Sequence, residues 1–147
     1  MADDEFSITT DKGRMDIAAI HAFLETSYWA AGIPRDVVER SIKGSDCFGV
    51  FRGSEQVGFA RVITDGATFA YLADVYILEQ HRGKGLAKRL MNAVMAHPPI
   101  AGVRRFMLVT RDAGALYEQY GFMSPPERNG IMQIVNRDIY RNPPGAR

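Results

Sequence analysis

The amino-acid sequence predicts an α/β fold in which a mixed, mostly antiparallel central sheet is flanked by about four helices. Three observations lead to this prediction. Helix-like and strand-like hydrophobic patterns follow each other along the 147 residues. Three strand-like runs are consecutive, and two of them flank a tight turn, which predicts antiparallel pairing. The segment 69–109 has the pattern strand, helix, strand, which is typical of a right-handed parallel crossover.

The first half of the chain is expected to supply one strand, two helices and a hairpin. The run FSITT at 6–10 predicts a short strand, and apolar residues three and four apart predict a helix over 15–29. A second helix is predicted at 34–44, with proline at its first position and glycine at its end. The two strands of the hairpin are predicted at 47–53 and 56–64.

The second half of the chain is expected to alternate strands and helices. The predicted elements are a strand at 68–78, a helix from about 83 to 97, a strand at 104–110, a helix at 112–121 and a last strand at 131–135. The Pro/Gly-rich end, about 141–147, is expected to be a flexible tail. A chain of this length suits one domain, so we expect a single domain over 1–147.

The composition excludes several classes of protein. A net charge of +1 provides no overall basic field, so we expect no nucleic-acid partner and no membrane partner. One cysteine, Cys47, allows no intrachain disulfide, and the three histidines show no metal-ligand spacing, so we expect no metal. The N-terminus lacks the apolar core of a signal peptide, and no apolar run approaches ~18–20 residues, so we expect a cytoplasmic protein.

The segment QHRGKGLA at 80–87 joins a predicted strand to a predicted helix. Gly83 and Gly85 allow a close backbone approach to a ligand, and the helix N-terminus offers unpaired N–H groups. This combination predicts a phosphate or pyrophosphate site. It is not a P-loop, because no Ser or Thr follows Lys84, and it is not a dinucleotide fingerprint, because position 88 is lysine.

Two motifs resemble those of the GNAT superfamily of acetyltransferases. Gln80-x-x-Gly83-x-Gly85 resembles the family's acetyl-CoA loop, [Q/R]-x-x-G-x-[G/A]. TRDAGALYEQYGF at 110–122 resembles its helix N-x-x-A-x-x-x-Y-E-K-x-G-F, with Thr110 in place of the usual asparagine. The order of elements fits the family over nearly the whole chain. The chain is therefore identified as a single-domain, bacterial-type member, which implies a splayed strand pair that forms the acyl-CoA cleft.

The resemblance implies an N-acetyltransferase that moves acetyl from acetyl-CoA to a primary amine of a small molecule by direct attack. The loop amides would bind the pyrophosphate, and the pantetheine arm would lie along the strand at 68–78. The amide near Val75 would point at the thioester carbonyl and stabilise its developing negative charge. The implied cofactor-binding residues are Val75, Ile77, Arg82, Gly83, Lys84, Gly85, Leu86, Ala87, Thr110, Asp112 and Tyr117.

The resemblance also implies catalytic roles, and the residues leave alternatives open. Tyr117 matches the family's acid, which protonates the departing thiolate, although its position in the helix also suits a core residue. Tyr71 lies near the position where some members carry a glutamate, and tyrosine is a poor base at neutral pH. Asp74 is the nearby carboxylate. It acts as the base, acts through water, or is structural.

The acceptor site is expected near the link between the first two helices. Tyr28, Trp29, Tyr71 and Arg111 are the predicted lining residues, although Trp29 can instead pack against the sheet. Arg35 or Arg111 would hold a substrate carboxylate. Protein lysine or N-terminal amines are alternative acceptors, and a catalytically silent acyl-CoA-binding module is an alternative function. We expect a monomer or a homodimer.

Overall fold

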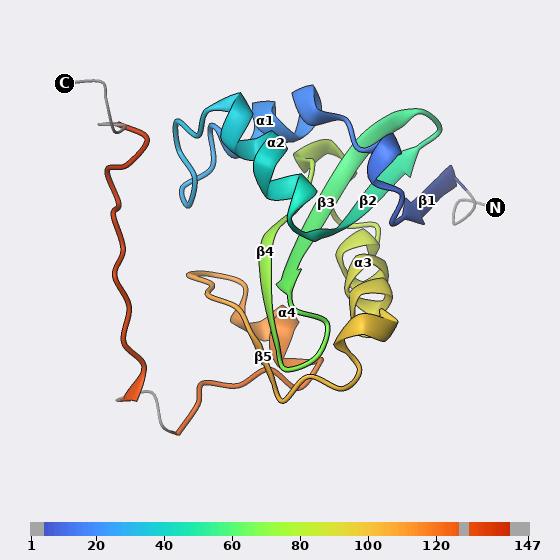
Figure 1. The fold of residues 1–147 in the computed structure, drawn as a ribbon. Helices are drawn as coiled ribbons and strands as arrows, with labels where there is room; N and C mark the ends of the chain where they lie inside the picture. Colours follow the sequence, from blue (N-terminus) through green and yellow to red (C-terminus); the bar gives the residue numbers. More distant parts are fainter. Residues whose placement is uncertain (1–4, 127–129, 142–147) are drawn as a thin grey trace.

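A five-stranded sheet forms the centre of the computed structural model, which describes residues 5–126 and 130–141. Its strand order is β1-β2-β3-β4-β5 (Figure 1). The first four strands pair antiparallel, and only β5 runs parallel to its neighbour β4. The strands are β1 (Phe6–Thr9), β2 (Asp46–Arg52), β3 (Glu55–Thr64), β4 (Phe69–Ile77) and β5 (Arg105–Met107). The predicted mixed, mostly antiparallel sheet and the hairpin are thus confirmed.

Four α-helices cover the sheet: α1 (Ile17–Leu24), α2 (Arg35–Lys43), α3 (Leu86–Met95) and α4 (Gly114–Glu118). Short 3-10 turns lie at Lys12–Arg14, Glu79–His81 and Pro98–Ile100. Because side chains alternate across a strand, the sheet has an apolar core on each face. One core contains α1 and α2 and the other contains α3 and α4, and Figure 1 shows α3 on the opposite side from α1 and α2.

The first helix is shorter than the prediction of 15–29. It begins after Asp16, whose Oδ1 accepts a hydrogen bond from the Ala19 amide at 3.0 Å, and it ends at Leu24. The Ser27 hydroxyl donates a hydrogen bond to the Leu24 carbonyl at 2.7 Å. A helix that continued past Leu24 would use this carbonyl as the acceptor for a backbone amide. Tyr28 and Trp29 therefore lie in the following loop and do not close the helix.

The third helix begins at Leu86 and not near Gly83. Gly83 and Gly85 both have positive φ values, 79° and 76°, so the backbone of this loop is not helical. In the second helix, Pro34 is the residue before the first helical position and not the first position itself. β5 is also shorter than the predicted strand at 104–110.

The prediction of a last strand at 131–135 is wrong for this chain. Residues 131–136 have no strand partner among the described residues, and the backbone of 131–135 makes no hydrogen bond to them. The composition favours a strand, but a strand forms only where an edge pairs with it. In Figure 1 this segment (orange-red) runs along the left of the molecule. Most of the predicted tail, residues 142–147, lies outside the described residues.

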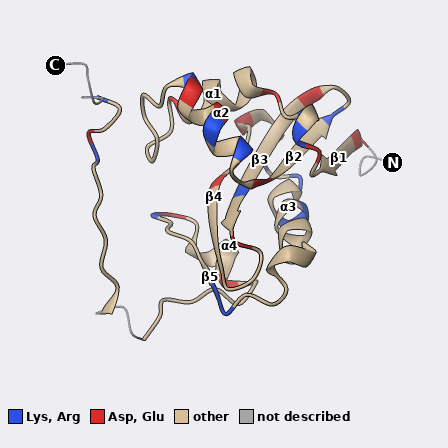
Figure 2. Cartoon of the chain, viewed as in Figure 1, with Lys and Arg blue, Asp and Glu red and all other residues tan. Residues whose placement is uncertain are grey.

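Charged residues of both signs are interspersed over the helices and loops, as Figure 2 shows. This distribution accompanies a net charge of +1. None of the helices in the described part of the chain is both long and apolar enough to span a membrane.

Candidate active site

A cleft opens where β4 and β5 separate. The two strands pair only through Phe69–Tyr71 of β4 and Arg105–Met107 of β5, and the rest of β4 has no β5 partner. A cavity of about 910 Å³ lies at this separation. Its walls are the middle of β4, the segment after β5, the loop after α1 and the segment 133–141. The predicted splayed strand pair is therefore present. Another cavity, of about 500 Å³ beside α1, contains none of the predicted site residues.

A β-bulge bends β4 at the wall of this cavity. Phe59 pairs with Tyr76 and Arg61 pairs with Ala73, so Asp74 and Val75 lie opposite one residue of β3. Asp74 has a φ of 56°, which is uncommon for any residue except glycine. At the bulge, the backbone of Val75 is released from regular pairing with β3. A backbone amide must be free of such pairing if it is to donate a hydrogen bond to a ligand.

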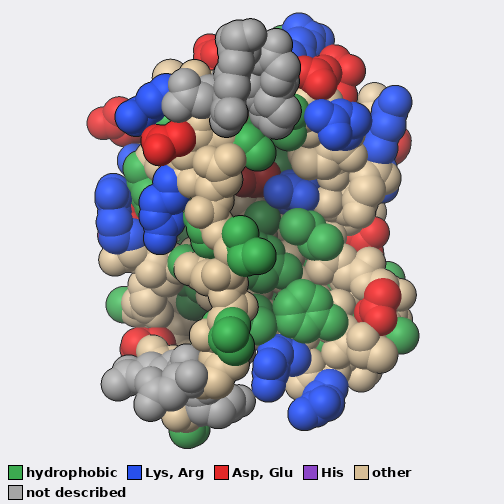
Figure 3. All heavy atoms as spheres, turned by 60° about the vertical axis from the view of Figure 1, so that its left-hand side comes forward, with side chains coloured by type: hydrophobic (Ala, Val, Ile, Leu, Met, Phe, Trp, Pro, Cys, Tyr) green, Lys and Arg blue, Asp and Glu red, His purple; other side chains and the backbone are tan. Residues whose placement is uncertain are grey.

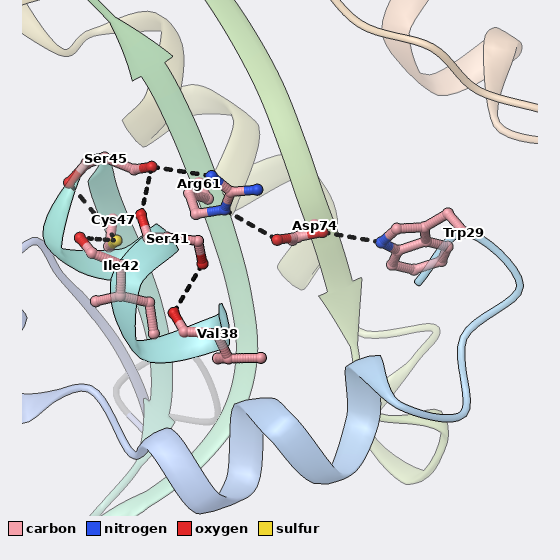
Figure 4. Close-up of polar contacts among 8 residues, drawn as sticks. All are labelled: Trp29, Val38, Ser41, Ile42, Ser45, Cys47, Arg61 and Asp74. Atoms are coloured by element: carbon pink, nitrogen blue, oxygen red, sulfur yellow. Dashed lines mark hydrogen bonds and ion pairs between the residues drawn. The ribbon is translucent and has the colours of Figure 1, made fainter. Parts of the chain in front are cut away.

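Asp74 is the centre of a polar network that joins four segments of the chain (Figure 4). Its Oδ2 accepts a hydrogen bond from Arg61 Nε at 2.9 Å, and its Oδ1 accepts one from Trp29 Nε1 at 2.9 Å. Arg61 Nη1 donates in turn to Ser45 Oγ at 3.0 Å. The side chains of Arg61 and Asp74 are only 14% and 9% exposed. Both oxygens of the candidate base are thus already engaged.

Tyr117 is a buried residue that lines the cavity. The residue is 8% exposed, and its ring contacts that of Phe122 edge to face at 6.0 Å between centres. The hydroxyl makes no hydrogen bond to the part of the chain that the structure describes. Burial, and then the nearby Tyr28 and Asp112, raise the pKa of Tyr117 above its usual 10. The hydroxyl therefore keeps its proton at neutral pH and is available to donate it.

The four predicted acceptor residues meet in the same cavity. The Arg111 guanidinium lies 3.7 Å from the centre of the Tyr28 ring, and Tyr28 contacts Trp29 edge to face. Tyr71 is half-buried, and burial raises its pKa, as does Asp74, while Arg61 opposes this rise. Arg35 instead pairs with Glu39 at 3.3 Å on the exposed face of α2 and is absent from the cavity wall.

The glycine loop lies beyond the end of β4 and outside the 910 Å³ cavity. A Cβ atom added to Gly83 or Gly85 would meet no other atom within 4 Å, so the outer face of the loop is open. The Arg82 Nε donates a hydrogen bond to the Ile77 carbonyl at 3.0 Å. Lys84 Nζ lies 5.3 Å from the centre of the Phe6 ring. Both residues are exposed, so the loop presents its backbone together with two basic side chains.

The two polar residues before α4 have different surroundings. Thr110 Oγ1 accepts a hydrogen bond from the Ala113 amide at 3.0 Å, so this hydroxyl already supports the start of the helix. Asp112 is exposed at the cavity wall, close enough to Tyr117 to affect its pKa. Thr110 therefore has less freedom to bind a ligand through its hydroxyl than the resemblance implied.

Two groups of residues at this site were missed by the sequence analysis. The first is Arg61, and the signal for it was a charged residue inside the apolar run 57–63. The second lies on the segment 133–141, between and including parts of the predicted strand at 131–135 and the predicted tail at about 141–147, and the sequence carried no signal for it. Its lining residues are Gln133, Val135, Asn136, Arg137, Ile139, Tyr140 and Arg141.

Known proteins resemble this chain in sequence and in fold. The model of the GNAT acetyltransferase domain matches residues 43–124. A Gibberella zeae protein named as an acetyltransferase is 33% identical, in an alignment that covers 77% of this chain and 76% of the relative. A GNAT-family crystal structure from Xanthomonas campestris pv. campestris is 48% identical with a TM-score of 0.90, and the match covers 92% of this chain and 96% of that one.

A more distant structure contains the ligand that the glycine loop and the cleft suggest. It is N-acetylglutamate synthase from Neisseria gonorrhoeae, complexed with coenzyme A and L-arginine. Its identity to this chain is 20% and the TM-score is 0.68, with 93% of this chain and 31% of that chain covered, so it shows the shared fold. Together with the family model and the closer relatives, the cleft and both motifs lead to one conclusion. The chain belongs to the GNAT family and is an acetyltransferase.

Proposed function

We propose that this chain, acting as one domain over 1–147, transfers acetyl from acetyl-CoA to the primary amine of a small molecule. The observation that carries the proposal is the cavity of about 910 Å³ at the separation of β4 and β5. It brings a protonated tyrosine hydroxyl, a strand bulge and four acceptor-side residues together, at one end of a strand whose other end leads into an open glycine loop.

The donor would bind along β4. Acetyl-CoA supplies the activated thioester. The amides of residues 82–87 would hold its pyrophosphate, because Gly83 and Gly85 leave the outer face of the loop open at the start of α3. Val75 and Ile77 would offer backbone groups to the pantetheine arm, although the Ile77 carbonyl already accepts from Arg82. The Val75 amide, at the bulge, would donate to the thioester carbonyl oxygen as this oxygen gains negative charge.

Tyr117 would protonate the sulfur of the departing CoA. A free thiol has a pKa of about 8.5, and tyrosine about 10 before any shift. Burial raises the pKa of Tyr117 further, so the hydroxyl is protonated whenever the enzyme works near neutral pH. Its lack of a hydrogen bond among the described residues leaves this proton available to the leaving group.

Asp74 would act as a positioning residue and not as the general base. Its two oxygens accept hydrogen bonds from Trp29 and Arg61, so it holds the acceptor loop against the bulged strand. Tyr71 is a poor base, because burial and Asp74 raise its pKa and its hydroxyl therefore stays protonated at neutral pH. Water in the cavity would therefore take the proton that the attacking amine releases.

The acceptor would carry a carboxylate in addition to its amine. The Arg111 guanidinium stacks on Tyr28 through one face, which leaves its N–H groups in the plane for a planar anion. Arg137 and Arg141 line the same cavity. Arginine binds carboxylates through two parallel hydrogen bonds, so this geometry favours a small amino acid over a neutral amine.

Two measurements test the proposal. Acetyl-CoA at 100 times its dissociation constant should add about 2.7 kcal/mol to the free energy of unfolding, which a thermal-shift assay detects. Thiol release with a panel of amino acids, their methyl esters and a lysine-containing peptide then identifies the acceptor. Turnover restricted to the peptide would reject a small acceptor, and CoA binding without any turnover would indicate a silent binding module.

A further inference from the structure

One hydrogen bond ties the loop after α1 to the sheet in the part of the chain that the structure describes. It joins Trp29 Nε1 to Asp74 Oδ1 at 2.9 Å. The other hydrogen bonds of residues 25–33 stay within the loop and α1. The place of Trp29 at the cavity wall therefore depends on how firmly the Asp74 carboxylate is held.

Trp29 is part of the surface that a ligand would meet. It is 42% exposed and lines the cavity of about 910 Å³, as does Asp74. In Figure 3, which brings the left side of Figure 1 forward, hydrophobic side chains gather at the middle of the face and charged side chains surround them. A ring in such a wall orients a ligand by shape, so a displacement of about 1 Å is enough to weaken the fit.

Arg61 holds the second oxygen of Asp74 from outside the cavity. Its Nε donates to Asp74 Oδ2 at 2.9 Å, its side chain is 14% exposed, and it is absent from the cavity wall. A guanidinium is planar and presents its N–H groups at fixed angles, so two hydrogen bonds define its orientation. The second of these bonds runs from Arg61 Nη1 to Ser45 Oγ at 3.0 Å.

The Ser45 hydroxyl is engaged on both sides. It donates its one proton to the Ser41 carbonyl of α2 at 2.7 Å, and it accepts a hydrogen bond from Arg61. Ser45 is 4% exposed and is also absent from the cavity wall. We refer to Ser45, Arg61 and Asp74 as the Trp29 anchor. Figure 4 shows that this anchor runs from the end of α2 across β3 and β4 to the loop after α1.

We propose that Arg61 and Ser45 are positioning residues for the acceptor, although neither of them lines the cavity. Without the bond to Ser45, the Arg61 guanidinium is free to tilt, and the Asp74 carboxylate turns with it. Trp29 then loses the fixed oxygen that holds its loop to the sheet. The glycine loop shares none of these contacts, so CoA binding should be unaffected. The kinetic consequence rests on the proposed acceptor site, whereas the effect on the loop does not.

The variant Ser45→Ala removes one bond of the anchor and leaves the pair of Arg61 and Asp74 in place. KM for the acceptor should rise roughly 3–10-fold, while KM for acetyl-CoA should stay the same. The matched control is Ser41→Ala, whose hydroxyl donates to the Val38 carbonyl within α2 at 2.7 Å, and it should change neither KM. An unchanged acceptor KM in Ser45→Ala, or equal changes in both variants, would overturn the proposal.

A double-variant cycle tests the route of the effect. Trp29→Phe keeps an aromatic ring and removes the N–H that bonds to Asp74. In this background Ser45→Ala should not raise the acceptor KM further, because the last bond of the route is already absent. Independent effects that multiply would mean that Ser45 acts on the acceptor by another route, which would overturn the proposal.

Hydrogen exchange of the Trp29 indole N–H, followed by NMR, tests the anchor without an acceptor. This exchange should be roughly 3–10-fold faster in Ser45→Ala than in the unmodified chain or in Ser41→Ala. Unchanged exchange in Ser45→Ala would overturn the positioning role, whatever the enzyme acetylates. Faster exchange in a protein that binds CoA and acetylates no amine would support the anchor and reject the proposed function, so the two failures are distinguishable.

Discussion

The substitution Asp74→Asn isolates the charge at the centre of the polar network. Asparagine keeps the size of the side chain, keeps an oxygen that can accept from Trp29, and tolerates the positive φ of 56° at this position. It removes the negative charge that faces Arg61, whose side chain is only 14% exposed. Breaking a buried ion pair on one side costs about 3–5 kcal/mol. Since Arg61 keeps its hydrogen bond to Ser45 and has some solvent contact, we expect a loss of about 2–3 kcal/mol.

Urea unfolding at pH 7 measures this loss as a lower midpoint with an unchanged slope. Glu39→Gln is the matched control, because it removes a similar charge from an exposed pair with Arg35. We expect it to cost less than about 0.5 kcal/mol. The double variant Arg61→Met/Asp74→Asn should recover part of the stability, because it leaves no unpaired buried charge.

Kinetics on the same variant separate the two roles of Asp74. If Asp74 positions Trp29 and the bulge, the substitution should raise KM for the acceptor and leave the shape of the pH–rate profile unchanged. If Asp74 is the general base, kcat should fall ~100–10,000-fold and the acidic limb of the profile should disappear. That second result, with a stability within 0.5 kcal/mol of the unmodified chain, would refute the reasoning.

Four further predictions follow from the described contacts. Gly85→Glu should abolish CoA binding in calorimetric titration. The control is Gly66→Glu, which changes a glycine with a similar positive φ of 73° in a distant turn and should leave CoA binding intact. Normal CoA affinity in Gly85→Glu would mean that the pyrophosphate binds elsewhere. Tyr117→Phe should keep CoA affinity and lower kcat by roughly 10–100-fold, and full turnover would remove Tyr117 from the mechanism. Burial raises the pKa of the Cys47 thiol to about 11. A thiol reagent at about pH 8 should therefore label this cysteine only as fast as the chain opens. Immediate labelling would contradict the burial of Cys47. Burial also raises the pKa of Tyr76, so the folded state resists ionisation of this residue. The stability that this provides is complete below about pH 10 and is lost as pH rises through the folded pKa. Alkaline unfolding of the unmodified chain and of Tyr76→Phe, compared over this pH range, would measure the loss.

The sequence alone predicted those elements whose signals are local. The hairpin of β2 and β3 and the helix α2 follow from periodicity and turn residues, and the loop before α3 follows from Gly83 and Gly85. The predicted strand at 131–135 failed because a strand needs a paired neighbour, and the segment has none among the described residues, which local composition does not report. The pairing of Arg61 with Asp74 was also missed, because the bulge that brings them together arises from strand register. The prediction of a cytoplasmic location remains a prediction.

Trp29 is the single tryptophan of the chain. Its indole N–H bonds to Asp74 at the wall of the cleft, and its side chain is 42% exposed. An indole in such a position changes its fluorescence when the polarity around it or its hydrogen bond changes. The enzyme therefore contains an intrinsic optical reporter at the wall of the cleft where we propose that the acceptor binds. Titrations followed by its emission would measure binding there directly, without a dye, a coupled enzyme or turnover.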